Sequence, residues 1–158
     1  MINLHVGVFW KIKNKLSDSV MKILPPTCEK CFEDFQQALE ELRETIRPFK
    51  NTPLDARSQH KVVRTFELTH ELALKTISEF FRKQGRPPFS GSRDATVEAF
   101  NEDLIDNGKG WLDIIIERIK FNPLYPGDYE AEFSQNIIKK HLALLENFER
   151  KMTEKLNK

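Results

Sequence analysis

Residues 27–49 read TCEKCFEDFQQALEELRETIRPF, and this stretch decides the fold of the chain. Its apolar side chains recur at steps of three and four residues, the spacing of one face of an α-helix. They are Cys28, Cys31, Phe32, Phe35, Ala38, Leu39, Leu42, Ile46 and Phe49. Thr27 stands where an N-cap is expected, and Pro48 lacks the backbone donor that a continuing helix needs. The stretch therefore predicts a helix with one buried side.

A second, longer helix is predicted from the capping signals at Thr52, Pro53 and Asp55, which combine a cap, a first-turn proline and an acid at the positive helix end. It ends at Gly85, a natural C-cap. Its apolar positions are Val62, Val63, Phe66, Leu72, Ala73, Ile77, Phe80 and Phe81. Because they cover more than one stripe, we expect this helix to be central and to contact several neighbours.

Three more helices are predicted between brief loops. Ser92 is expected to cap a short helix that fades near Asp106, with inner side chains Val97, Ala99 and Phe100. A fourth helix ends before Asn122 and carries Trp111, Leu112, Ile115, Ile116 and Ile119. Asp128 caps a terminal helix whose stripe is Phe133, Ile137, Ile138, Leu142, Leu145, Phe148 and Met152. The predicted fold is all-α, an antiparallel up-and-down four-helix bundle with one extra short helix.

Residues 1–24 follow a different pattern, in which apolar residues alternate as in a strand. They are Ile2, Leu4, Val6, Val8, Trp10 and Ile12. No partner strand is evident later in the chain. We therefore expect an N-terminal extension, either an edge strand or an arm, ahead of a helical-bundle domain of residues 25–158; alternatively, the natural protein starts at Met21.

Composition narrows the class of protein. The 158 residues include 25 basic and 24 acidic ones, and a net charge of +1 argues against a dedicated nucleic-acid binder. Two cysteines cannot form a disulfide framework, and no signal-peptide pattern or membrane-length apolar run is present. We expect a cytoplasmic protein. It has no phosphate-binding loop, dinucleotide fingerprint or nucleophile elbow, and no cofactor is predicted.

Cysteine and histidine residues show no metal-ligand spacing. Cys28 and Cys31 form a lone C-x-x-C pair on the apolar stripe, without a second pair for zinc, so packing is the favoured interpretation. His141 lies one turn from apolar residues and is expected to be structural. His70, beside Glu71 on the central helix, stays a functional candidate, and no metal site is predicted.

Charged residues on the helices give weaker signals. Asp113 and Glu117 lie four residues apart and share a helix face. Two close carboxylates can hold a metal or divide acid and base roles, but a solvated face of ion pairs is the favoured interpretation. Glu67, Glu71 and Lys75 follow the same spacing, and Glu71 and Lys75 stand in the favourable order for an ion pair. Arg118 is expected to point toward the loop that follows its helix.

Three segments carry a family pattern. Residues 66–75 read FELTHELALK, residues 92–100 read SRDATVEAF, and residues 104–113 read LIDNGKGWLD. In order and spacing they resemble the signatures Phe-Glu-x-x-x-Glu-Leu-Ala-Trp-Lys, Ser-Pro-Arg-Asp…Glu-Ala-Phe and Leu-Ile-Asp-Asp-Gly…Trp-Leu-Asp. These belong to the nucleotidyltransferase substrate-binding protein family, and the resemblance extends over residues 27–150. Leu74 departs from it, because the family has tryptophan there.

This resemblance implies a helical bundle, usually a homodimer, related to the HEPN group. It also implies a separate minimal nucleotidyltransferase as partner, often in a two-gene toxin–antitoxin unit, with the catalytic chemistry in that partner. The chain itself would be a non-catalytic substrate-binding subunit whose ligand is a nucleotide or RNA. The implied binding residues are His70, Glu71, Lys75, Arg93, Trp111, Asp113, Glu117 and Arg118.

The main departure concerns catalysis. HEPN ribonucleases use an arginine, often followed by asparagine, and a histidine about five residues later. Here Ile119 follows Arg118 and Pro123 occupies the place of the histidine, so no general acid or base is evident. A divergent HEPN ribonuclease using Arg118, and a bundle kept for dimerisation or scaffolding, remain alternatives. Tyr125 matches a tyrosine that partner nucleotidyltransferases modify with adenylate in related toxins.

Overall fold

A computed structural model of the protein describes residues 27–121, 124 and 128–158. The elements are α2 (Cys28–Ile46), η1 (Arg47–Phe49), α3 (Ala56–Lys83), α4 (Ser92–Asn101), α5 (Gly108–Lys120), α6 (Glu130–Asn136), η2 (Ile137–His141) and α7 (Leu142–Leu156). Within these ranges there is no strand, so the predicted all-α bundle is confirmed. The N-terminal extension predicted for residues 1–24 lies outside the described residues.

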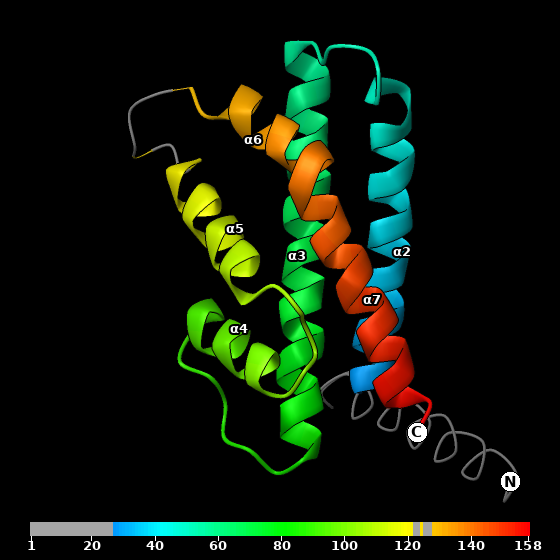
Figure 1. Ribbon diagram of the computed structural model, residues 1–158, viewed down its shortest axis with the longest axis vertical. Coiled ribbons are helices and arrows are strands. Elements are labelled where there is room, and N and C mark those ends of the chain that lie inside the picture. Colours follow the sequence, from blue (N-terminus) through cyan, green and yellow to red (C-terminus); the bar gives the residue numbers. More distant parts are fainter. Residues whose placement is uncertain (1–26, 122–123, 125–127) are drawn as a thin grey trace, which may run out of the picture.

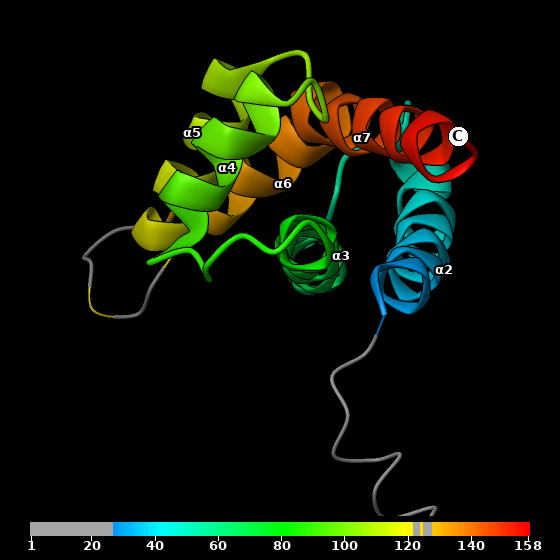
Figure 2. The same ribbon diagram turned by 90° about the horizontal axis from the view of Figure 1, so that it is seen from below.

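Helix α3 is the central element of the fold. Figures 1 and 2 show α2 along one side of it and α4 and α5 on the other. The continuous segment α6–η2–α7 runs from beside α5 to beside α2. Helix α3 contacts α2, α4, α6 and α7, as its wide apolar coverage predicts.

Several helix ends follow the predicted local chemistry. The Thr27 side chain accepts a hydrogen bond of 3.1 Å from the backbone N–H of Lys30 and caps α2. Pro48 lies in the 3₁₀ turn η1, where the α-helix has already ended. Gly85 follows α3 with φ +79°, a left-handed conformation that favours glycine.

Other helix starts differ from the prediction. Asp55, rather than Thr52, caps α3, because its carboxylate accepts a 2.7 Å hydrogen bond from the backbone N–H of Ser58. Tyr129 occupies the N-cap position of α6. The carboxylate of Asp128 still accepts from a backbone N–H of the first turn, at 3.3 Å. An acidic side chain near each start satisfies donors that the helix leaves free.

Helix α4 is shorter and turned differently from the prediction. It begins at Ser92, with Gly91 as N-cap, and ends at Asn101. Val97 and Phe100, predicted to face inward, are 43% and 51% exposed. The helix packs through its small side chains instead, and the buried ones are Ala95, Thr96 and Ala99.

The core is built on the apolar stripe of α2. Eight of the nine predicted stripe residues are buried, while Phe49 packs against the core from a half-buried position. The Phe35 ring meets Phe148 of α7 edge-on at 5.2 Å and stacks with Phe32 at 6.1 Å. None of the described helices has both the length and the hydropathy that crossing a membrane requires.

The two cysteines belong to this core. Cys28 and Cys31 are free thiols with 3% and 1% exposure. Burial, helped by the nearby Glu29 carboxylate, raises the pKa of Cys28 to about 11. Since the thiolate is the reactive form, this thiol is inert at neutral pH. The packing interpretation of the C-x-x-C pair is confirmed.

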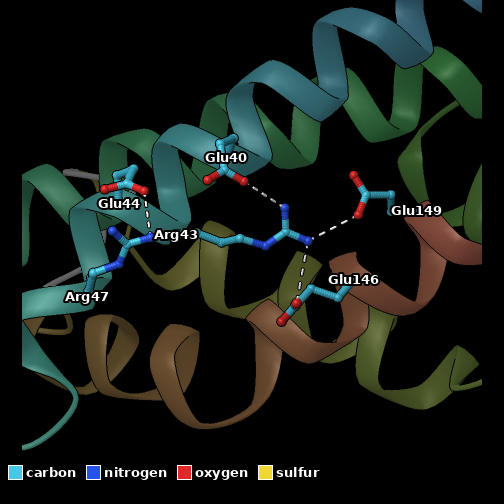
Figure 3. A network of polar contacts seen from close by, with 6 residues as sticks. All are labelled: Glu40, Arg43, Glu44, Arg47, Glu146 and Glu149. Atoms are coloured by element: carbon cyan, nitrogen blue, oxygen red, sulfur yellow. Dashed lines mark hydrogen bonds and ion pairs between the residues drawn. The ribbon is translucent and has the colours of Figure 1, made fainter.

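An ion-pair network joins α2 to α7 at the surface (Figure 3). Arg43 of α2 lies 3.1 Å from Glu40 on its own helix. Its other terminal nitrogen lies 3.0 Å from Glu149 and 3.4 Å from Glu146, both on α7. This network connects the first half of α7 to α2.

Candidate functional site

Four polar side chains meet between α3 and α5, and we call them the α3–α5 cluster: Glu67, His70, Glu71 and Arg118. One terminal nitrogen of Arg118 lies 2.9 Å from Nδ1 of His70 and 2.7 Å from Oε1 of Glu71. The other lies 3.8 Å from Oε2 of Glu67. The three α3 residues share one helix face, since they are three and four residues apart. Arg118 thus points at α3, and most of the loop toward which it is predicted to point lies outside the described residues.

His70 is the buried member of the α3–α5 cluster, with 1% exposure. Its ring stacks on Phe66 at 6.1 Å and lies against Trp111 at 5.7 Å. Because Arg118 donates to Nδ1, the proton of the neutral ring is on Nε2, which has no partner among the described residues. Burial first, then the charge of Arg118, lowers the pKa of His70 to about 3. The imidazole is therefore neutral at physiological pH.

The fold brings to Arg118 an imidazole that the sequence does not predict there. The missing histidine after Arg118 left no imidazole for acid–base chemistry, but the fold brings His70 to Arg118 from another helix. That imidazole cannot serve as a general acid near neutral pH, because its protonated form is too scarce at a pKa of about 3. Its Nδ1 is also occupied by the arginine. Pro123 and Tyr125 lie outside the described residues.

The α3–α5 cluster lines an open groove, which we call the α3–α5 groove. The groove has a volume of about 310 Å³, and its apolar walls include Leu74, Ile115 and Ile119. A larger hollow of about 580 Å³ shares Glu71, Leu74 and Ser92 with it and continues past Lys75. The Glu71 side chain is 59% exposed at the rim, whereas Arg118 is 22% exposed. The groove thus presents a guanidinium held between carboxylates and flanked by apolar surface.

The two carboxylates of α5 separate into different surroundings. Asp113 pairs with Lys109 at 3.1 Å, as a surface ion pair predicts. Glu117 instead turns inward, where its oxygens accept hydrogen bonds of 2.8 Å from Asn136 and 3.2 Å from Nε2 of His141. The interpretation as one solvated face is therefore wrong for Glu117. Burial lowers the pKa of His141, against the opposing effect of Glu117.

The remaining predicted binding residues are scattered. Trp111 is fully buried in the core and does not line the α3–α5 groove. Arg93 is exposed on the first turn of α4 and does not itself line the groove, although the preceding Ser92 does. Glu71 pairs with Arg118, and no ion pair joins it to Lys75 within the described ranges. No group of three or more described histidine, cysteine or acidic residues is placed to hold a metal ion.

Two members of these polar clusters were missed from the sequence. Asn136 had no assigned role, and it bonds Glu117 across 19 residues of chain. His141 was read as structural, without its carboxylate partner. The spacing of residues within one helix identified Glu67 and Glu117 only as parts of charged faces. Which helix they would meet depends on tertiary packing, and no local pattern carries that information.

Comparison with solved structures finds chains of similar fold at low sequence identity. One similar chain comes from a structure described as "tri-AMPylated Shewanella oneidensis HEPN toxin in complex with MNT antitoxin". The TM-score is 0.66 at 12% identity, over 83% of this chain and 99% of that chain. Another comes from a mutant of the toxin–antitoxin pair MntA-HpeT, with a TM-score of 0.60 at 14% identity, over 80% and 97% of the two chains. Comparison with curated proteins gives no match.

Residues 30–154 match the family described as "Nucleotidyltransferase substrate binding protein like". The chain belongs to this family, as the sequence signatures predict.

Proposed function

We propose that this chain is the substrate-binding and partner subunit of a separate minimal nucleotidyltransferase. The observation that carries the proposal is the family match over residues 30–154. The sequence itself has none of the familiar phosphate-binding loops, which accords with catalysis in another chain. A binding subunit needs an accessible surface with fixed polar groups, and the α3–α5 groove has that character.

The proposed contact surface is the α3–α5 groove. Arg118 is held by Glu67 and Glu71, so its orientation is set before a ligand or partner arrives, which lowers the ordering cost of binding. The rim carries charges of both signs, with Glu71 beside Lys75 in the adjoining hollow. Three further proposed binding residues do not line the groove: Arg93, Asp113 and Glu117. Each of them requires a ligand or partner that extends beyond the groove.

Assembly is also part of the proposal. The similar structures are described as toxin–antitoxin complexes, and one half of such a pair is the role we propose here. A homodimer is supported by large apolar side chains that are about half exposed: Leu68, Val97, Phe100, Ile116 and Ile119. Exposed apolar surface of this kind often marks a protein interface. Sedimentation showing only monomer at micromolar concentration would count against the dimer.

The ribonuclease alternative has less support. Arg118 is paired with Glu71 at 2.7 Å, so a phosphate would have to displace a carboxylate to reach it. His70 is neutral and buried, because its pKa is about 3. We expect purified protein to show no RNA cleavage that depends on Arg118.

The partner proposal is tested by mixing the purified chain with the minimal nucleotidyltransferases of the same genome and measuring complex mass by light scattering after size exclusion. We expect one of them to form a stable complex. Glu71→Lys, which reverses an exposed rim charge, should weaken it at least about tenfold. Glu41→Lys, an exposed residue of α2, is the matched control and should not. If none of these enzymes forms a complex, the proposal fails.

Tyr125 stays a proposed modification site from the family resemblance. Co-expression with the partner and ATP should add nucleotide mass to a peptide that contains Tyr125. An unmodified peptide, with the partner active on another substrate, would remove this part of the proposal.

A further inference from the structure

Helix α5 is held to the rest of the protein differently at its two ends. Its first half buries Trp111 and Ile114, and the loop before it is tied to α7 through Asp106, which lies 2.7 Å from Lys151. In its second half, none of residues 115–120, which we call the α5 end, is buried. Because burial of apolar surface is the main stabilising term in packing, the α5 end is fixed less firmly than the start of the helix.

Polar contacts hold the α5 end in place. Arg118 donates to Nδ1 of His70 on α3 at 2.9 Å, and Glu117 accepts from Nε2 of His141 on η2 at 3.2 Å. After the helix, the half-buried Phe121 adds a ring contact with the core. Hydrogen bonds can be exchanged for bonds to water, so the α5 end can separate at a lower cost than an apolar helix face.

The interface around α5 is also incompletely satisfied. Four buried polar atoms are without a hydrogen-bond partner among the described residues: Oε1 of Glu67, Nε2 of His70, Nε1 of Trp111 and Nδ1 of His141. Each of them belongs to α5 or to a residue that contacts α5. An unsatisfied buried polar atom destabilises the closed form, the arrangement that the structure shows, and regains a hydrogen bond when water reaches it. Hydrogen bonds to water therefore offset part of the cost of opening.

His70 couples such an opening to protons. In the closed form, burial together with the charge of Arg118 on Nδ1 lowers the pKa of His70 to about 3. The charged or titratable groups around the ring are Arg118 from α5, Glu67 and Glu71 from α3, and His141 from η2. When Arg118 leaves, Nδ1 faces the α3–α5 groove, which both residues line, and the two carboxylates lose their cation. A protonated His70 supplies the cation that they then lack.

We propose that the α5 end is a gate over the α3–α5 groove, which separates from α3 together with Arg118 and opens further in acid as His70 takes up a proton. Near neutral pH the closed form does not bind this proton and the open form does, so acid shifts the population toward the open form. The open gate widens the groove and frees Arg118 for an acidic group of a ligand or partner. This use of the gate rests on the proposed function, whereas the opening itself is a property of the isolated chain.

The test is amide hydrogen exchange of the full chain, followed by NMR at pH 7.5 and 5.5. The protection factor is the exchange rate of an unstructured peptide at the same pH divided by the measured rate. It should be at least about a hundredfold smaller for Glu117, Arg118 and Ile119 than for Leu39 and Leu42, which are fully buried in α2. With a histidine pKa of about 6.5 in the open form, protection of the α5 end should fall about tenfold from pH 7.5 to 5.5.

Two variants separate His70 from other causes of pH dependence. His70→Gln should remove the pH response of the α5 end, while His60→Gln, which changes an exposed histidine of the same helix, should keep it. Fraying of the helix end without movement of Arg118 would make protection independent of pH, and opening only by global unfolding would make it equal to that of α2. Either result in the wild type would overturn the proposal, whether or not His70→Gln folds. So would an unchanged pH response of His70→Gln. These outcomes do not depend on whether a nucleotidyltransferase binds.

Discussion

The two sides of α3 are built from different chemistry. Toward α2, the helix buries apolar residues against an apolar stripe in which Phe35 and Leu39 have no exposure. Toward α5, it buries His70 and holds Glu67 against a guanidinium, with the Nε2 of His70 and one oxygen of Glu67 unpartnered among the described residues. The first side follows the ordinary rule of a folded core. The second gives up stability that apolar packing would supply.

The contrast separates what the protein needs for folding from what it needs for binding. An apolar interface is stabilised by each residue that leaves water. A half-satisfied polar cluster is less stable than an apolar core of the same shape, so its presence calls for another reason. Recognition of a ligand or partner by the α3–α5 groove is the reason we propose.

The largest effect is expected on the apolar side. Phe35→Ala removes a ring that contacts Phe148 at 5.2 Å in a site with no exposure. We expect the free energy of unfolding to fall by about 3–5 kcal/mol, measured by denaturant titration. Gln37→Ala, two residues away and exposed, should change it by no more than about 0.5 kcal/mol. A Phe35 effect as small as the control would show that the apolar stripe of α2 is not part of the core.

A smaller effect is expected on the polar side. Arg118→Ala leaves the Nδ1 of His70 without its donor and removes the cation beside Glu67, which is 22% exposed. We expect a loss of about 2 kcal/mol in the free energy of unfolding. Lys120→Ala on the same helix is exposed and should be nearly neutral. If Arg118→Ala and Lys120→Ala change the free energy of unfolding equally, the α3–α5 cluster contributes no more to stability than a surface ion pair does.

The third prediction concerns pH. The pKa of His70 is about 3 in the folded chain, against an unfolded value of about 6.5. Between these values the unfolded chain binds the extra proton, so stability is lost as pH falls below about 6.5. At pH 5.5 we expect the His70 contribution to cost about 1.4 kcal/mol relative to pH 8.

Urea titrations at pH 8 and 5.5 measure this loss. His70→Gln should be less sensitive to the pH change than the wild type by that amount. His141, whose pKa is also lowered, gives a drop of the same sign in both proteins and cancels in the difference. Equal pH dependence of the two proteins would mean that His70 is accessible to protons in the folded state.

The smallest effect is expected at the surface. Arg43→Ala removes three ion pairs, two of which join α2 to α7, but its side chain is 29% exposed and water screens the charges. We expect a loss below about 1 kcal/mol that shrinks further at high salt. Arg47→Ala, which removes one pair from a side chain that is 67% exposed, should have almost no effect. A large loss in the free energy of unfolding of Arg43→Ala that does not change with salt would show that this network stabilises the protein as strongly as a core contact does.

Most of the fold could be predicted from the sequence, because helix periodicity and helix caps depend on residues that are close together in the chain. The stripe of α2 and the Gly85 stop are examples. The polar contacts were not readable, since Arg118 and His70 are 48 residues apart and meet only after the helices pack. Threonine and aspartate are both favoured N-cap residues, so the capping rule alone could not show that Asp55, and not Thr52, caps α3. The family signatures identified the chain's family without locating the α3–α5 groove.

The segment η2 is a π-helical turn, and this turn determines which residues of the α6–η2–α7 segment share its buried face. Phe133, Ile137, His141 and Leu145 are all buried although each lies four residues after the last. In an ideal α-helix each such step overshoots a full turn by about 40°, so three steps would rotate the buried line by about 120°. The wider turn absorbs this excess like one inserted residue. Deleting a single residue there would restore regular α geometry, but it would rotate α7 and carry Glu146 and Glu149 away from Arg43.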